Sequence, residues 1–123
     1  MDFAQLSVVA HQVVAAVQRR LPPAVRVVAE RVPVSYESHP NATLQSEGLE
    51  PDILGLFVGH EHQGELDEGA PLPSQILLFL ENIWDYAEGD EATYRDEVRL
   101  TYLHELGHYL GWDEDEIAQR GLE

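Results

Sequence analysis

A chain of 123 residues suits a single domain spanning residues 1–123, with room for one modest core. It has no cysteine, which excludes disulfides and thiolate ligands, so a transition metal would have to be bound by His, Asp and Glu side chains. Seven basic residues, all arginine, stand against 23 acidic ones, and the formal charge of −16 opposes binding to nucleic-acid backbones.

The first predicted element is an amphipathic helix over residues 2–20, where apolar residues recur at spacings of three and four. The Leu-Pro-Pro sequence at 21–23 is expected to end it, because proline cannot continue the helical hydrogen bonds. Alternating β-branched residues from Val25 to Val32 predict a strand that Pro33 closes. The polar residues 33–52 are expected to form a long loop.

Two further strands are predicted over Ile53–Val58 and Gln75–Leu80, with connecting loops over residues 59–74 and 81–90. Asp90 is then a candidate N-cap for a long helix that runs to about residue 110, where Gly111 would end it. The acidic run 113–116 is typical of the start of a short terminal helix. The order predicts an α+β fold, in which a small mixed sheet packs against an N-terminal helix and a C-terminal active-site helix.

The pattern His-Glu-x-x-His at 104–108 indicates a metal site on a helix. Residues four apart lie on one face of a helix, so His104 and His108 can direct imidazole nitrogens at one ion. Glu105 lies beside them and could reach a water on that ion without being a ligand. Apolar residues occupy the opposite side, which we expect to pack on the sheet while the histidines face a cleft. Thr101 lies on the same predicted helix face, toward the N-terminus from His104, and could line the site or support a histidine.

A catalytic zinc ion takes three protein ligands and keeps a position open for water. Gly111 and Glu114 follow His108 by three and six residues, and a glycine tolerates the sharp turn that would bring the chain back to the ion. Glu114 is therefore the predicted third ligand, with Asp113 and Asp115 close enough to compete. This context favours a metal site over a solvated helix with two surface histidines.

The run from His104 to Gly111, with the acidic residues that follow, resembles the minimal zincin-like metallopeptidases of bacteria. Residues 53–59 resemble the middle strand of that family and residues 72–76 the entry to its next strand, so the similarity spans roughly residues 20–118. It implies a zincin-like fold and a peptidase activity, without naming a substrate. Metzincins are also similar at this turn, but they usually place His or Asp where this chain has Glu114.

The predicted function is peptide-bond hydrolysis by a metal-activated water, with Zn²⁺ bound by His104, His108 and Glu114 and with Glu105 as general base. The expected partner is a peptide or protein, which could add as a strand to the sheet edge at residues 75–80. No targeting or membrane-spanning segment is recognised, so we expect a cytoplasmic protein without nucleic-acid or membrane partners.

Two other functions stay open at this point. One group of bacterial metal-dependent endoribonucleases carries three histidines at a similar spacing, although Glu105, Glu114 and the charge of −16 all depart from that pattern. A non-catalytic metal-binding or interaction module is the other alternative. His60 and His62 could share one face of a strand, but their acidic, glycine-containing surroundings favour an exposed turn. His11 and His39 are expected to be structural or surface residues.

Overall fold

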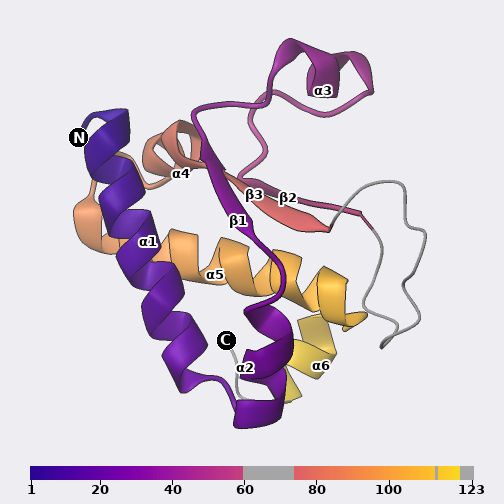
Figure 1. Cartoon of the computed structure of the whole chain (residues 1–123). Coiled ribbons are helices and arrows are strands. Elements are labelled where there is room, and N and C mark those ends of the chain that lie inside the picture. Colours follow the sequence, from indigo (N-terminus) through magenta and orange to yellow (C-terminus); the bar gives the residue numbers. More distant parts are fainter. Residues whose placement is uncertain (60–73, 113, 120–123) are drawn as a thin grey trace.

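The computed structural model describes residues 1–59, 74–112 and 114–119 (Figure 1). Its elements follow one another as α1 (Phe3–Arg20), α2 (Pro23–Ala29), β1 (Val34–Glu37), α3 (Ala42–Ser46), β2 (Gly55–Val58), β3 (Gln75–Phe79), α4 (Leu80–Tyr86), α5 (Glu91–Leu110) and α6 (Glu114–Gln119). The fold is small, mixed and α+β, as predicted, with long helices near both ends of the chain.

The three strands form one sheet in the order β1-β3-β2. β1 runs parallel to β3, with Val34 opposite Ile76, whereas β2 runs antiparallel to β3, with Gly55 opposite Leu78. β3 is therefore the central strand and is paired on both sides. The expectation that residues 75–80 offer an edge to a substrate strand is wrong, because β1 and β2 already occupy the two edges of β3.

Helix α1 crosses α5 and packs on both α4 and α5 (Figure 1). Two buried tyrosines of α5 link these helices: the Tyr94 hydroxyl donates to the carbonyl oxygen of Leu6 at 2.8 Å, and Gln18 donates to the Tyr102 hydroxyl at 3.1 Å. Burial raises the pKa of Tyr94 and of Tyr102, so ionisation of both hydroxyls is disfavoured even in alkaline solution. The tyrosines thus serve the core and hold α5 in place.

The ends of the long helices follow from local side chains. Asp2 and Gln5 form a capping box at the start of α1, and the Asp90 side chain accepts from the Thr93 N–H at 2.9 Å at the start of α5. Gly111 ends α5 with φ of 73°, a left-handed conformation that glycine adopts without a steric penalty. The predicted boundaries of α5 are confirmed.

Across the described ranges, none of the helices has both the length and the apolar character needed to cross a bilayer.

The predicted strand over residues 25–32 is wrong, because this segment forms α2 and the turn after it. Pro23 stands in the first helical turn, where its missing N–H costs nothing and its fixed φ favours the helix. Val25, Val28, Ala29 and Val32, three or four residues apart, are the apolar side chains that reach the core. The apolar period is therefore helical, although the composition is rich in β-branched residues.

Two predicted loops also contain regular structure. Residues 33–52 include β1 and the short helix α3, and residues 81–90 are mostly α4. β1 forms because it pairs with β3 some forty positions later, and α4 forms because Leu80 and Ile83, three apart, are fully buried. Within the predicted loop 59–74, residues 60–73 lie outside the described residues.

Asn82 of α4 holds the segment that leads into β2. Its buried amide nitrogen donates to the carbonyl oxygens of Pro51 at 2.8 Å and Ile53 at 2.9 Å, so its Oδ1 accepts from His39 Nδ1 at 2.7 Å. This contact fits the structural or surface role expected for His39 and requires a proton on its Nδ1.

Replacing Asn82 with alanine is expected to lower the free energy of unfolding by about 2 kcal/mol, because a buried amide that donates to two carbonyl oxygens is lost. Urea denaturation measures this change. Gln45→Ala is the matched control, since it removes an exposed amide that donates to the carbonyl oxygen of Pro40, and its effect is expected to be smaller. Equal effects of the two substitutions would contradict the anchoring role.

Candidate metal centre

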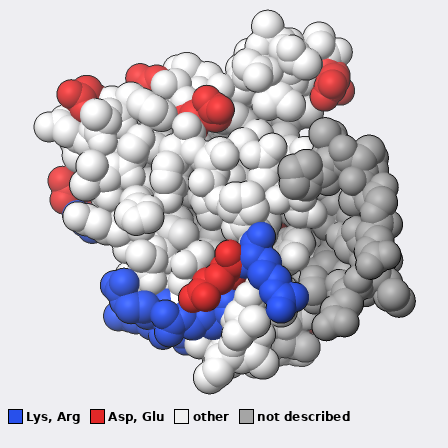
Figure 2. All heavy atoms as spheres, viewed as in Figure 1, with Lys and Arg blue, Asp and Glu red and all other residues white. Residues whose placement is uncertain are grey.

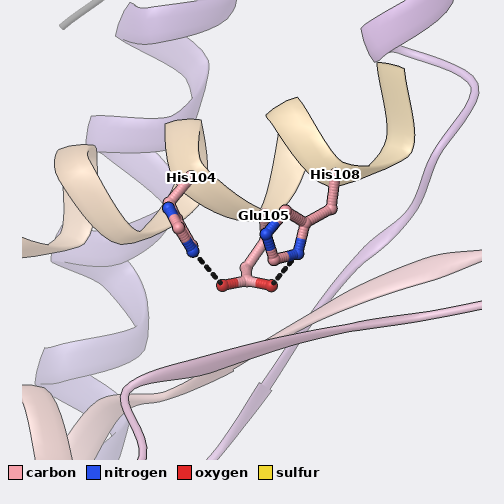
Figure 3. Close-up of side chains that lie close together, drawn as sticks. All are labelled: His104, Glu105 and His108. Atoms are coloured by element: carbon pink, nitrogen blue, oxygen red, sulfur yellow. Dashed lines mark ion pairs between the residues drawn. The ribbon is translucent and has the colours of Figure 1, made fainter. Parts of the chain in front are cut away.

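The candidate site lies on the C-terminal half of α5, where His104, Glu105 and His108 project together toward the strands (Figure 3). One ligand atom from each of the three side chains lies within 4.8 Å of the others. The two imidazole rings stand edge to face with their centroids 4.6 Å apart. The sequence prediction that the two histidines share a helix face with Glu105 beside them is confirmed.

The carboxylate and the imidazoles differ in exposure. The Glu105 side chain is 9% exposed, whereas those of His104 and His108 are 42% and 50% exposed. Glu105 Oε1 lies 3.4 Å from His108 Nδ1, and Oε2 lies 3.9 Å from His104 Nε2, so the carboxylate spans the space between the two rings. Two half-exposed imidazole rings could therefore bind a metal ion from solvent. The largely buried carboxylate between them could accept a proton.

The packing around α5 differs in part from expectation. Val98, Tyr102 and Leu106 are buried, as predicted. β2, however, lies on the side of α5 that carries Thr101 and Glu105, rather than on the side opposite the histidines. That opposite side is covered by α1. The structure therefore gives Thr101 a packing role against β2.

Gly55 makes this close approach possible. A Cβ built on Gly55 would lie 2.6 Å from Thr101 Cγ2, 3.2 Å from the carbonyl oxygen of Leu77 and 3.3 Å from Glu105 Cγ. The first distance is far inside van der Waals contact, and Thr101 is a stiff, buried side chain. Glycine is needed here because the backbone of β2 passes directly beside the site helix.

Further along β2, the rings of Phe57 and Tyr109 meet edge to face with centroids 5.8 Å apart. Since Gly55 lies against Thr101 and Glu105 while Phe57 lies against Tyr109, β2 runs along α5 in the same direction as the helix. No strand among the described residues pairs with the outer edge of β2. The edge strand that accompanies the site is thus β2.

Gly55→Ala is expected to lower the free energy of unfolding by about 2 kcal/mol, because the new methyl group forces β2 away from α5. Adding Thr101→Ser removes the methyl group that the new side chain meets, and we expect the double variant to recover about half of the loss. Urea denaturation of the single and double variants compares the two. An unchanged stability in Gly55→Ala would show that β2 does not approach α5 as closely as described.

The third predicted ligand is placed by its backbone alone. Glu114 opens α6, which follows the turn at Gly111 as expected, but its side chain and the whole of Asp113 lie outside the described residues. Asp115, the other competitor, is exposed and does not join the group of His104, Glu105 and His108.

The sequence contains four further histidines. His60 and His62 fall outside the described residues, and His11 is exposed on α1, as expected of a surface residue. Sequence reasoning missed two residues that position the site, Gly55 and Asn82. A glycine inside a predicted strand is the signal that could have pointed to the first.

A helix that presents two imidazoles and a carboxylate to one point defines a candidate divalent-metal centre of the kind used by hydrolases. Residues 29–122 match a protein family described as zincin-like metallopeptidase. Because the match covers most of the chain, this protein belongs to the zincin-like metallopeptidase family. The match includes the site and the whole sheet, and it favours the peptidase prediction over the endoribonuclease alternative. Among curated proteins, none matches the chain.

Proposed function

We propose that this protein is a zinc-dependent peptidase whose site is built on α5. The observation that carries the proposal is the position of Glu105, a sheltered carboxylate between two half-exposed histidines, in a chain of a metallopeptidase family. A surface helix with two incidental histidines has no reason to bury a glutamate between them, since an unpaired buried carboxylate is costly.

The residues proposed to hold the ion are His104, His108 and Glu114. Imidazole nitrogens and carboxylate oxygens are the donors that zinc takes in cysteine-free sites, and the described part of this set lies close enough together to share one ion. Bound zinc would supply a polarised water and a Lewis acid for the scissile carbonyl.

Glu105 is the proposed general base and acid. Its carboxylate would take a proton from the attacking water and return it to the leaving amine. Packing of its Cγ close to Gly55 limits the positions that the side chain can take, so the carboxylate stays beside the two imidazoles. The contact with β2 would therefore help to hold the catalytic carboxylate in place.

We propose that the substrate peptide lies along the outer edge of β2. Extended peptides bind to exposed strand edges through main-chain hydrogen bonds. Because β2 runs along α5 beside Thr101 and Glu105, a strand added there would pass close to the site. Leu56 and Val58, which are half-buried on the alternate face of β2, could contact the side chains of such a peptide.

Metal content and hydrolysis together test the proposal. We expect one zinc per chain by mass spectrometry, cleavage of members of a fluorogenic peptide library, loss of cleavage with a chelator, and recovery on adding zinc. Zinc binding without cleavage of any library member would instead support the non-catalytic metal-binding module. Failure to bind zinc would reject both.

Replacing Glu114 with alanine is expected to weaken zinc binding on the order of 100-fold, because loss of a ligand costs at least as much as loss of a residue that orients one. Asp115→Ala, one residue further along α6, is the matched control and should leave the affinity unchanged. Competition with a zinc-binding dye measures both. The opposite result, with only Asp115→Ala weakened, would assign the third ligand to Asp115.

A further inference from the structure

A groove of about 500 Å³ lies where α1 crosses α5. Its lining includes Val17 and Arg20 from α1 and Arg95, Arg99 and Leu103 from α5. These α5 residues follow one another at spacings of four, so they share a helix face that points away from the side carrying His104 and His108. The groove is therefore separate from the candidate metal centre.

The charge of this groove is opposite to that of the whole protein. Three arginines line it against one acidic residue, Asp96, although the chain has a formal charge of −16. Figure 2 shows the basic side chains gathered on the lower part of one face, around the end of α1 and over α2, while most acidic side chains in view lie elsewhere. The groove therefore offers an anionic group a local excess of arginine side chains.

The arginines are available to a ligand. Arg99 pairs with Asp96 at 2.8 Å and Arg95 with Glu91 at 3.4 Å, but both pairs join partly exposed neighbours one turn apart on α5, and such pairs contribute little. Arg20 is exposed and has no ion-pair partner in the part of the chain that the structure describes. A carboxylate from another molecule could therefore replace or add to these contacts.

The floor of the groove is apolar, because Val13, Val17, Leu21 and Leu103 line it between the arginines. A ligand that fits must combine apolar groups with carboxylates. The volume suits several side chains of a peptide. A nucleic acid fits poorly, since the residues that line the groove include no aromatic ring on which a base could stack.

We propose that this groove binds an acidic amphipathic segment of a partner protein, whose leucine-like side chains rest on the floor while its carboxylates pair with Arg20, Arg95 and Arg99. The groove would recruit proteins to the face of α5 that points away from His104 and His108, independently of the chemistry at these histidines. It does not require the chain to be a peptidase.

Binding of a defined probe tests this proposal. The probe is a short fluorescein-labelled peptide with Leu and Glu on one helical face, compared by anisotropy with a version that has Lys for Glu and another that has Ser for Leu. We expect only the Leu/Glu peptide to bind, with an affinity that falls as salt rises. Equal binding of the lysine version, or no binding of the Leu/Glu peptide, would overturn the proposal.

Substitutions locate the binding. Arg20→Gln and Arg99→Gln are each expected to weaken it about tenfold, as loss of a charge-assisted hydrogen bond does. Arg26→Gln is the matched control, because Arg26 of α2 pairs with Glu30, the residue after that helix, and does not line the groove. Unchanged binding in both groove variants would overturn the assignment. Sedimentation showing a dimer that Arg20→Gln abolishes, with the probe unbound, would assign the groove to a second copy of the chain. Thermal melting checks that the variants are folded.

Discussion

Glu105→Gln is expected to reduce peptide hydrolysis on the order of 10³-fold while zinc stays bound. The amide keeps the size of the side chain and its packing against β2, but it cannot accept the proton of the attacking water. The two histidines are unchanged, so the affinity for zinc should stay within a few fold. Initial rates on the cleaved library peptide and zinc stoichiometry, measured on the same preparation, check both parts of the result.

Glu97→Gln is the control for this experiment. Glu97 lies on the same helix two turns before Glu105, is partly exposed, and does not belong to the group formed with His104 and His108. The same chemical change there should leave the rate unaltered. If Glu105→Gln cleaved peptides as fast as the Glu97 variant does, another group would have to be the general base.

His104→Ala is expected to lower the bound zinc from one ion per chain to nearly none, because it removes one of the two imidazoles that lie side by side. The loss should also appear in stability. Zinc at 100 times its dissociation constant should stabilise the wild-type fold by about 2.7 kcal/mol, whereas the variant should not respond. Mass spectrometry measures the first effect, and urea denaturation with and without added zinc measures the second.

His11→Ala provides the comparison for this variant, since His11 is exposed on α1 and away from the site. It should retain the metal and the stabilisation. Zinc retained by His104→Ala at full stoichiometry would show that the ion binds elsewhere and would remove the basis of the proposed function.

The parts of the fold that local side chains control were predictable. The boundaries of α5 depend on Asp90 and Gly111, which act within one turn of the helix ends. The site on α5 depends on a four-residue spacing, which fixes a common face wherever the helix forms. The family resemblance, found on the same residues, is confirmed by the match over residues 29–122.

The predictions are wrong where contacts between residues far apart in the sequence determine the local structure. β1 is polar and short, and it becomes a strand because β3 pairs with it, as the contact between Ser35 and Gln75 illustrates at 3.3 Å. Residues 25–32 mislead in the other direction, because β-branched side chains fill a helical face. The approach of Gly55 to Thr101 and Glu105 is equally long-range, so no local pattern reveals that β2 lies beside the site.

The outer edge of β2 also bears on whether copies of this protein associate at high concentration. Among the described residues no strand pairs with this edge, and an edge strand with Leu56, Phe57 and Val58 in sequence is a template for pairing with its counterpart in another copy. Proteins with such edges usually need a means of keeping them apart, and here a formal charge of −16 gives two copies a net electrostatic repulsion. The carboxylates thus help to prevent association through the same strand that the proposed substrate would use. This protection weakens in acid, because protonation of the carboxylates reduces the negative charge.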